Sequence, residues 1–427
     1  MKKLLGLWLV FLTLMITVSM TFKACATTTS SWLMFQHDPQ HTGYTSDEIS
    51  SNVVQKWNFT SQFGGAPITT PVVADDLVFF GTDDGYFFAV YQGNGTYKWW
   101  RPLGEPTNSP AVDPTRHLVF IGVYRYLYAR DTLTGNLNWS IDTDEWHSAP
   151  IFDSEKGILT IGGSNDGGFS NAALYDLNET NGVNLGKSYS WYPDGIIFCS
   201  PASDGTNEFV GSYYYPGGGS YVADGDFWGD GWHIYLGEGI KSSASIGFGF
   251  IYVGGMDGNL YSLYQSDGET SWFRSTKGPI ESSPAIDSSK GLVIVGSDDS
   301  RLYCFRWDGA AKWNHTFNTP VVNSPVITAN SKVVISVNDT VYALDEDTGN
   351  EIWRYKTGGR LTSVAIANDT IFVGSADGHL YALSSSAPIP EFPSILILPL
   401  LIMTTLLVAL ICKKEFKKAK QTSSPAI

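Results

Sequence analysis

The stretch VYALDEDTGNEIW, from Val341 to Trp353, decides the fold that this sequence predicts. Apolar and polar residues alternate on both sides of a polar turn that Gly349 closes, which is typical of two half-buried strands joined in a hairpin. Variants of this stretch recur along most of the 427 residues. One hairpin is marginal in water, whereas hairpins stacked at a fixed period bury a common core.

A small residue, in most repeats followed by proline, opens each repeat. Successive openings lie 39, 40, 51, 43, 40, 41 and 39 residues apart, and they are Thr70-Pro71, Ser109-Pro110, Ala149-Pro150, Ser200-Pro201, Ser243-Ala244, Ser283-Pro284, Ser324-Pro325 and Ser363-Val364. This period fits one four-stranded blade of a β-propeller, and the segments between openings lack the 3.6-residue spacing of helical repeats. The sequence therefore predicts an all-β, eight-bladed β-propeller over residues 53–386.

A tryptophan ends the aromatic strand of five repeats, namely Trp99, Trp139, Trp272, Trp313 and Trp353. The last repeat, residues 379–386, stops before it has one. The strand around Trp57, upstream of the first opening, can supply this missing outer strand. Pairing the two ends of the chain in one blade closes the ring and leaves only short, protected sheet edges. Between Trp139 and Trp272 the repeats are stretched and their pattern is weakest.

The two ends of the chain predict export and anchoring. Residues 1–26 combine lysines, an apolar run and a small-residue cleavage site, as a secretory signal does, and the length of the run leaves an uncleaved anchor as the alternative. Residues 27–52 form a lead-in segment. After a Pro-containing stalk, residues 387–394, an uncharged run over residues 395–412 is long enough to cross a bilayer as a helix. The five lysines of residues 413–427 place this tail in the cytoplasm and the propeller outside.

The predicted exported part is strongly acidic. Without the eight lysines of the two ends and Glu415 it holds 19 basic and 41 acidic residues, a net charge of about −22. Such a charge repels nucleic acid. Its two cysteines, Cys199 and Cys304, lie in separate repeats and are expected to be buried thiols. Seven Asn-x-Ser/Thr sequons agree with an exported, glycosylated surface, and they are Asn58, Asn94, Asn138, Asn178, Asn314, Asn338 and Asn368.

The repeated pattern G-S-x-D-G-x-L-Y-A-L-D-x-x-T-G-x-x-x-W, present in pieces in residues 341–353 and 374–383, resembles the pyrroloquinoline-quinone-type β-propeller repeat. Residues 32–45, WLMFQHDPQHTGYT, look like the lead-in of that superfamily. The resemblance implies an eight-bladed propeller whose closing tryptophans dock between neighbouring blades. The family includes quinone-dependent alcohol and sugar dehydrogenases, and also non-catalytic scaffolds such as the bacterial outer-membrane assembly lipoprotein.

The ending of the chain carries a second resemblance. PEFPS, followed by an apolar span and lysines, is similar to archaeal C-terminal surface-sorting signals with a Pro-Glu-Phe motif. That resemblance implies removal of the tail and its exchange for a lipid-like anchor, as the alternative to a retained membrane helix.

For a quinone enzyme, the resemblance implies a specific set of groups. A Ca²⁺ ion is held by carboxylate and amide ligands over the quinone, an Asp acts as base, and an adjacent Cys-Cys pair is usual. This sequence has no Cys-Cys pair, and no Glu, Asn and Asp set aligns with the family's positions. We therefore expect no catalysis and no cofactor, with a quinone-dependent dehydrogenase as the alternative.

Acidic residues and histidines raise three metal hypotheses, none of which we expect to hold. The segment DGDFWGDG imitates a Ca²⁺ loop with Asp224, Asp226 and Asp230, but an aromatic residue replaces a needed oxygen ligand. His37 and His41 have a His-x-x-x-His spacing on a Pro-containing loop, with no third ligand nearby. Turn chemistry explains the other aspartates, because Asp caps a loop through its own side chain; they are Asp83, Asp84, Asp257, Asp298, Asp299, Asp308 and Asp377.

The stretched blades offer the best candidate for a binding surface. Aromatic rings beside flexible backbone can stack on sugars or anchor a protein, and those found here among glycines are Tyr213, Tyr214, Tyr215, Phe227, Trp228 and Trp232. The alternative is that they only fill an irregular blade. We predict a cell-surface, membrane-anchored, non-catalytic binding or protein-interaction scaffold whose partner is a protein or a surface glycan. A quinone-dependent dehydrogenase and an extracellular glycan-binding module are the competing functions.

Overall fold

The computed structural model describes residues 30–104, 108–142, 148–154, 156–164, 172–189, 195–197, 199–214, 218–224, 232–236 and 238–384. These residues form β-strands and turns and contain no helix, so the all-β prediction is confirmed. Within the same ranges, nothing helical is long and apolar enough to cross a bilayer. The predicted signal peptide, stalk, membrane helix and cytoplasmic tail lie outside the described residues.

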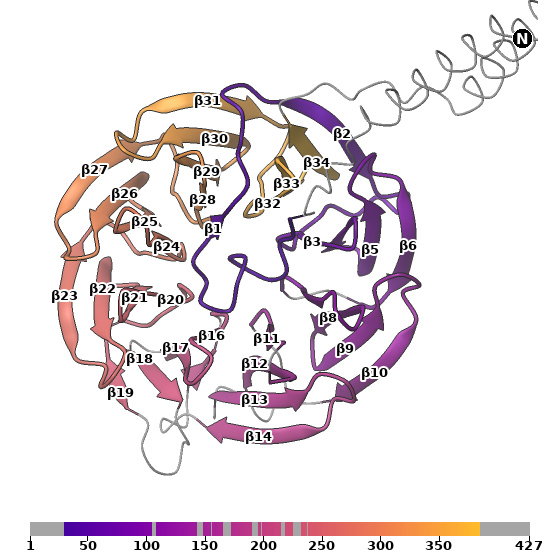
Figure 1. The fold of residues 1–427 in the computed structure, drawn as a ribbon, viewed down its shortest axis with the longest axis horizontal. Helices are drawn as coiled ribbons and strands as arrows, with labels where there is room; N and C mark the ends of the chain where they lie inside the picture. Colours follow the sequence, from indigo (N-terminus) through magenta and orange to yellow (C-terminus); the bar gives the residue numbers. More distant parts are fainter. Residues whose placement is uncertain are drawn as a thin grey trace, which may run out of the picture.

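The described strands form eight small sheets, and in each sheet the strands run outward from the centre in chain order, except that an N-terminal strand forms the outer edge of the last sheet (Figure 1). Sheet I consists of β3 (Val72–Ala74), β4 (Leu77–Gly81), β5 (Tyr86–Tyr91) and β6 (Tyr97–Pro102). Sheet II consists of β7 (Ala111–Asp113), β8 (Leu118–Val123), β9 (Tyr126–Asp131) and β10 (Leu137–Asp142). Sheet III consists of β11 (Ile151–Asp153), β12 (Ile158–Ser164), β13 (Ala172–Asn178) and β14 (Asn184–Tyr189). Sheet IV consists of β15 (Gly195–Ile196), β16 (Ala202–Ser203), β17 (Glu208–Tyr214), β18 (Gly218–Asp224) and β19 (His233–Tyr235).

The remaining sheets continue around the same ring. Sheet V consists of β20 (Ser245–Gly247), β21 (Phe250–Gly254), β22 (Asn259–Tyr264) and β23 (Thr270–Ser275). Sheet VI consists of β24 (Ala285–Asp287), β25 (Leu292–Ser297), β26 (Arg301–Arg306) and β27 (Ala311–Thr316). Sheet VII consists of β28 (Val326–Thr328), β29 (Lys332–Val337), β30 (Thr340–Asp345), β31 (Glu351–Lys356) and the short β1 (Tyr44–Thr45). Sheet VIII consists of β32 (Ala365–Ala367), β33 (Thr370–Ser375), β34 (His379–Ser384) and β2 (Val54–Thr60).

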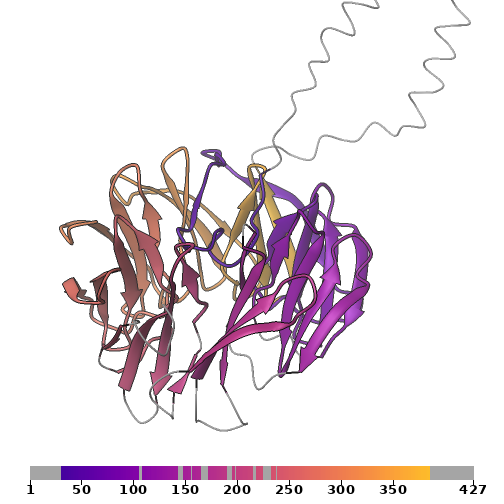
Figure 2. The same ribbon diagram turned by 60° about the horizontal axis from the view of Figure 1, so that its bottom comes forward.

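The ring of sheets is a β-propeller, and both ends of the described chain meet in sheet VIII (Figure 2). β2 pairs antiparallel with β34, with Trp57 opposite Ala382 and Thr60 opposite His379. The strand around Trp57 therefore supplies the outer strand that the last repeat lacks, as the sequence predicts. This pairing covers an edge of β34 that would otherwise be open to solvent.

Burial falls from the centre of the ring to its rim. In sheet VII, β28 and β29 are buried along almost their whole length, whereas β31 alternates between exposed and buried positions. Continuous Val and Ile runs suit strands that are covered on both faces. The hairpin from Val341 to Trp353 forms β30 and β31, and its Gly349 takes a φ of 71° while its N–H donates to the Asp345 carbonyl at 2.8 Å. Glycine adopts this left-handed backbone without the strain of a Cβ.

The small residues that open the repeats form a chain of hydrogen bonds along the ring. The hydroxyl of Ser243 accepts the backbone N–H of Ser200 at 2.8 Å, and the hydroxyl of Ser283 accepts that of Ser243 at 2.9 Å. The series continues to Ser324 at 3.0 Å and to Ser363 at 3.2 Å. Each of these serines fastens one sheet to the next, which explains physically why the step recurs in the sequence.

The lead-in segment, described here from residue 30 to residue 52, lies across the centre of the ring (Figure 1). Trp32 pairs with Val73 of β3, and β1 runs parallel to β28. Carbonyls of the segment also accept N–H groups from β28 and from four other innermost strands at 2.7 to 2.9 Å, and the donors are Val112, Ser203, Ile246, Ile286 and Ile327. The segment thus pairs with the inner edges of six sheets.

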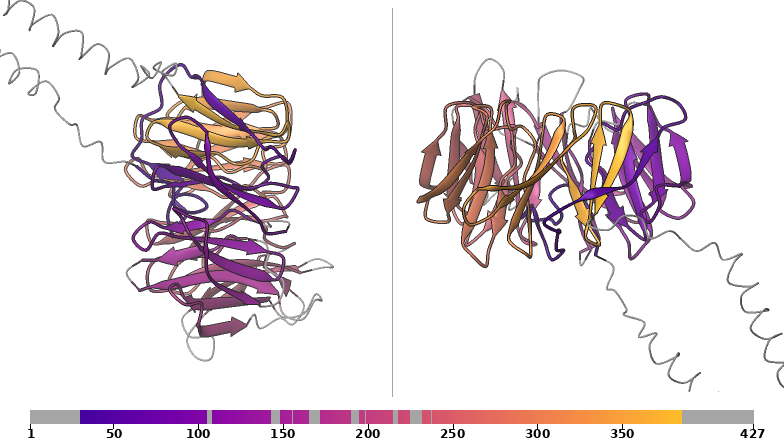
Figure 3. Two further views of the ribbon diagram at one scale, coloured as in Figure 1. Left: turned by 90° about the vertical axis from the view of Figure 1, so that its right-hand side faces the viewer. Right: turned by 90° about the horizontal axis from the view of Figure 1, so that it is seen from above.

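The ring has two faces, which Figure 3 shows from the side. The lead-in face carries the turns between the first and second and between the third and fourth strands of each sheet. The linker face carries the other turns and the connections between sheets. The Asp47 carbonyl accepts the N–H of Ala329 at 3.1 Å and the Asp369 carboxylate accepts that of Glu48 at 3.0 Å. Because Ala329 and Asp369 belong to first turns, the lead-in segment lies at the lead-in face.

Candidate functional site

The structure describes only part of the aromatic surface predicted from the sequence. Tyr213 and Tyr214 end β17, where their backbones pair with β15. Tyr215, Phe227 and Trp228 lie outside the described residues. A binding role for these five residues stays a prediction.

Trp232, the sixth predicted surface residue, fastens two sheets together. Its indole N–H donates to the Gln265 carbonyl at 2.9 Å, and its ring covers Gly268 so closely that a Cβ there has no room. The same indole-to-carbonyl bond, at 2.7 to 3.0 Å, is made by Trp57, Trp99, Trp139, Trp272, Trp313 and Trp353. Leu185 replaces tryptophan in sheet III and is 54% exposed. Trp232 therefore has the structural position of a closing tryptophan.

We call the residue whose carbonyl receives an indole the clamp residue, and at five boundaries its side chain also bonds to the preceding sheet. Gln92 of sheet I accepts a hydrogen bond from Asn368 of sheet VIII at 3.0 Å. Gln265 of sheet V donates to Asp204 of sheet IV at 3.1 Å. The other polar clamps are Thr132 to Asp75 at 3.0 Å, Glu179 to Arg116 at 2.5 Å and Glu346 to Lys290 at 2.7 Å. Charge-assisted bonds of this kind are among the stronger ones in proteins.

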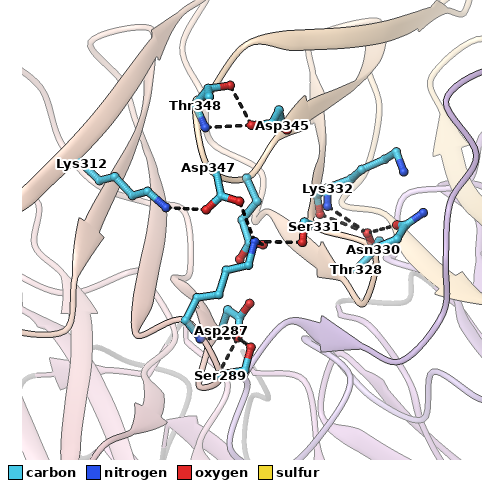
Figure 4. Close-up of polar contacts among 12 residues, drawn as sticks. Asp287, Ser289, Lys312, Thr328, Asn330, Ser331, Lys332, Asp345, Asp347 and Thr348 are labelled. Carbon is cyan, nitrogen blue, oxygen red and sulfur yellow. Dashed lines mark hydrogen bonds and ion pairs between the residues drawn. The ribbon is translucent and has the colours of Figure 1, made fainter.

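The clamp between sheets VI and VII belongs to a larger ionic cluster. The Lys290 ammonium donates to Glu346 at 2.7 Å, to Asp347 at 3.0 Å and to Ser331 at 2.9 Å. The Lys312 ammonium donates to the other oxygen of Asp347 at 2.7 Å, and Figure 4 shows these two side chains facing each other. Two cations thus share two carboxylates across the boundary between the sheets.

Glu346 is the most strongly perturbed group of this cluster. Its side chain is fully buried, and burial raises its pKa to about 7, with Asp287 acting in the same direction and Lys290 against it.

The clamp between sheets II and III repeats this chemistry with an arginine. The Arg116 guanidinium contacts Asp113 at 3.0 Å and Glu179 at 2.5 Å, and both carboxylates are buried. Burial and then the charge of Asp113 raise the pKa of Glu179. No ligand atom reaches a fully buried acid, and a general acid or base must lie within hydrogen-bonding distance of its substrate. We therefore interpret both acid clusters as latches between sheets.

Two cavities border the lead-in segment. The larger has a volume of about 610 Å³ and is lined by Ser30, Ser31, His37, Ser46, Asp47, Glu48 and Asp369. The smaller, of about 430 Å³, lies between the lead-in segment and the first turns of sheets III and IV. In the larger cavity Asp47 accepts hydrogen bonds from Ser30 at 2.7 and 2.8 Å and from Thr45 at 2.9 Å. Its carboxylate is therefore engaged in holding the segment in place.

The two histidines of the lead-in segment lie in different environments. His41 is buried and its Nδ1 lies 3.1 Å from the Ala244 carbonyl, so burial lowers its pKa to about 4. His37 is partly exposed and contacts Asp38 at 3.4 Å. Among the described residues, no group of three His, Cys, Asp or Glu side chains lies together in a way that could hold a metal ion. Asp224 ends β18, and Asp226 lies outside the described residues, as does Asp230.

The turn aspartates bond within their own hairpins and, in the case of Asp377 and Asp299, also to a preceding connection between sheets. Asp377 accepts backbone N–H groups from Gly358 and His379 at 2.9 and 3.1 Å and the hydroxyl of Tyr381 at 2.8 Å. Asp299 receives the hydroxyl of Tyr303 four residues later at 2.6 Å, as Asp257 receives that of Tyr261. These contacts agree with the turn chemistry expected from the sequence.

One described boundary departs from the polar pattern. Between sheets V and VI the clamp residue is Trp307, whose carbonyl receives Trp272 at 2.9 Å but whose ring lies 6.4 Å from that of Phe248 and 6.1 Å from that of Phe250. The Tyr264 ring lies 5.1 Å from that of Phe250. Trp307 is 46% exposed, Tyr264 43% and Phe248 36%. We call Phe248, Phe250, Tyr264 and Trp307 the aromatic platform.

Two spacings in the sequence indicate the contacts between closing tryptophans, glycines and clamp residues, and the sequence analysis did not use them. A glycine follows the closing tryptophans of sheets VIII, I, II, V and VI by 36 to 43 residues, and Gly268 follows Trp232 of sheet IV by 36. The polar clamp residue stands three positions before that glycine. Trp307 stands only two positions before Gly309, because this turn is one residue shorter and Gly309 bonds to the Arg306 carbonyl. The altered turn marks the aromatic platform in the sequence.

The comparisons with known proteins agree with a propeller of the pyrroloquinoline-quinone-like repeat type. Residues 257–387 match the family described as outer membrane protein assembly factor BamB. BamB from Moraxella catarrhalis has 17% identity and a TM-score of 0.63, over 78% of this chain and 100% of its own. No curated protein matches the sequence significantly.

Enzymes with the same fold are equally similar. The quinohemoprotein alcohol dehydrogenase of Pseudomonas putida HK5 has 14% identity and a TM-score of 0.69, over 85% of this chain and 82% of its own. A europium-containing methanol dehydrogenase has 13% identity and a TM-score of 0.70, over 83% of this chain and 98% of its own. At such identities the likeness concerns the fold alone.

Proposed function

We propose that this chain is an exported, membrane-anchored β-propeller of eight blades that acts as a non-catalytic binding or protein-interaction scaffold at the cell surface. In this proposal each described sheet is one blade. The partner is a protein or a surface glycan, and the strongly acidic exported part disfavours nucleic acid.

The position of the lead-in segment is the observation that carries the proposal. The inner edges of a ring of sheets are the backbone groups nearest the axis. Six of them are hydrogen-bonded to the lead-in segment. Its hydrogen bonds at 2.7 to 2.9 Å and the buried side chains of Trp32 and Met34 make it part of the folded core. The centre of the lead-in face is thus engaged in stabilising the ring, which supports a role for the outer surfaces in binding.

The quinone-dependent dehydrogenase remains the alternative enzyme, and the available side chains fit its cofactor poorly. A Ca²⁺ ion over a quinone needs six to eight oxygen ligands, of which several are carboxylate or amide oxygens that converge on one point. The described residues bring no three metal-binding side chains together. The sequence has no adjacent cysteines, and its Cys199 and Cys304 are free and buried.

Anchoring is proposed from the two ends of the chain. The last described strand, β34, ends at Ser384, after which the Pro-containing stalk and the uncharged run of residues 395–412 follow. A retained helix places the propeller outside the membrane. Mass measurement of the mature C-terminus tests this point, since loss of residues 395–427 would instead indicate exchange for a lipid-like anchor.

Two assays, one on the purified chain and one on intact cells, separate the scaffold from the enzyme. Addition of pyrroloquinoline quinone and Ca²⁺ is expected to give no stoichiometric binding and no oxidation of alcohols or sugars. Crosslinking on intact cells, followed by purification of the chain and mass spectrometry, is expected to retain a specific surface protein or glycan. Stoichiometric quinone binding with turnover would refute the scaffold, and recovery of the chain alone after crosslinking would count against it equally.

A further inference from the structure

The aromatic platform departs from the pattern of the polar clamps. At five boundaries the clamp residue is polar and bonds to the preceding sheet. Between sheets V and VI, large rings are exposed on the lead-in face, with Trp307 46% and Tyr264 43% exposed. The fold gains no clamp hydrogen bond there and leaves apolar surface in water. Exposed apolar patches that folding does not favour are characteristic of binding sites.

The backbone of Trp307, in the middle of the platform, is held from below. The Trp307 N–H donates to the Gly291 carbonyl at 3.0 Å, and the Trp307 carbonyl accepts the Trp272 indole at 2.9 Å and the Tyr252 hydroxyl at 3.3 Å. The indole lies directly over Gly291, where an added Cβ would come within 3.0 Å of Cδ1. Rigidity of this kind lowers the entropy lost when a ligand binds.

The size of the platform selects the kind of ligand. Its three exposed rings present roughly 250 Å², if a full aromatic side chain offers about 150–250 Å². A stable protein interface needs about 800 Å² from each partner. The platform alone is therefore smaller than a protein interface, and its area matches a flat ligand that covers one or two rings.

Polar groups next to the rings define the chemistry of that ligand. Asp308 directly follows Trp307 in the chain. The Glu269 carbonyl accepts the N–H of Tyr264 at 3.0 Å. Asp308 and Glu269 are both exposed residues. Carboxylates accept hydrogen bonds from hydroxyl and ammonium groups. A pyranose has an apolar face of C–H groups and a rim of hydroxyls, which matches rings flanked by carboxylates. The acidic charge of the exported part disfavours sugars that carry carboxylates or sulfates.

We infer that the aromatic platform binds a pyranose ring of a neutral or amino-sugar glycan, stacked on Trp307 with its hydroxyls directed at the carboxylates of Asp308 and Glu269. This inference goes beyond the proposed scaffold role, because it assigns a ligand class to residues outside the predicted aromatic surface. It does not depend on the identity of a protein partner.

A glycan array tests this inference on the full chain in detergent. The probes are cello-, manno-, malto- and chito-oligosaccharides, with uronic-acid and sialylated oligosaccharides as anionic comparisons. Wild type is expected to bind at least one neutral or amino-sugar series. Trp307→Ala is expected to weaken that binding by about tenfold or more, as truncation of a central aromatic anchor does. This variant keeps the backbone carbonyl of residue 307, which accepts the Trp272 indole. A melting curve checks that the variant is folded.

Tyr97→Ala is the matched control, because Tyr97 is 56% exposed and lies in sheet I, away from the platform. Its glycan binding is expected to equal that of wild type. Equal loss in both variants, unchanged binding in Trp307→Ala, or binding of anionic glycans only would each overturn the inference. Absence of all glycan binding would overturn it too, while the proposed scaffold role would still stand if the crosslinked protein partner were found. Loss of that protein partner in Trp307→Ala would assign the platform to a protein instead.

Discussion

Substitution of Gly135 by alanine tests the packing between tryptophan and turn that fastens the sheets. Gly135 has a φ of 68° in the turn between β9 and β10, and an added Cβ would lie 2.6 Å from Cδ2 of Trp99. An alanine at this φ costs about 1 kcal/mol. Displacing the indole forfeits its 2.8 Å bond to the Thr132 carbonyl, about 1 kcal/mol. Disturbed packing adds about 1 kcal/mol. The expected loss of unfolding free energy is about 3 kcal/mol.

Gly378→Ala supplies the matched control, because Gly378 has a φ of 90° and no heavy atom within 4 Å of an added Cβ. It should cost only the backbone strain, about 1 kcal/mol. For residues 30–384, an unfolding entropy of about 2.1 cal/mol/K per residue converts these losses to melting shifts of roughly 4 °C and 1 °C by calorimetry. Gly135→Ala made in a Trp99→Leu background should also cost only about 1 kcal/mol, since the ring is gone. Equal shifts for Gly135→Ala and Gly378→Ala would refute the packing argument.

Three further predictions follow from how far particular side chains are buried or bonded. They concern the pH dependence of stability, the glycosylation pattern and the reactivity of the thiols. The pKa of Glu346 is about 7 in the folded state against 4.5 ordinarily, so this group contributes about 3 kcal/mol below pH 4.5 that is lost as the pH rises through 7. Urea midpoints should therefore fall between pH 5 and 8 more steeply for wild type than for Glu346→Gln, and parallel profiles would contradict the assignment. Peptide mapping should find glycan on exposed Asn138 but none on Asn368, whose amide nitrogen is hydrogen-bonded at 3.0 Å. A thiol reagent at pH 8 should label Cys199 and Cys304 only after unfolding, because burial raises both pKa values to about 12.

The propeller could be predicted because its unit is local. In the hairpin from Val341 to Trp353, the alternation and Gly349 determine strands and turn within thirteen residues. The closing of the ring could also be predicted from the sequence. The last repeat lacks its outer strand, and the strand around Trp57 lies upstream of the first repeat without a hairpin partner of its own. Period and turn chemistry carry this information without any knowledge of distant contacts.

The clamps could not be predicted in the same way, because each joins residues far apart in the sequence. Gln92 and Asn368 lie 276 positions apart, and either one alone reads as a solvated surface residue. Trp232 was assigned to a binding surface because the repeat is irregular around it, although its 36-residue distance to Gly268 matched that of other closing tryptophans. The aromatic platform was missed because Phe248 and Trp307 come from different repeats, and their approach depends on how the two sheets pack.

The pairing of β2 with β34 also determines the order in which the molecule can be completed. Val54 meets Ser384 across this pair, so β2, which the ribosome makes early, must wait for β34, the last described strand. Contacts between such distant segments form late, because the chain between them must first be ordered. During synthesis, the lead-in segment can pair only with those inner edges that have already formed. A chain that ends before residue 379 would lack this partner, so its open edges would make it a substrate for chaperones and proteases.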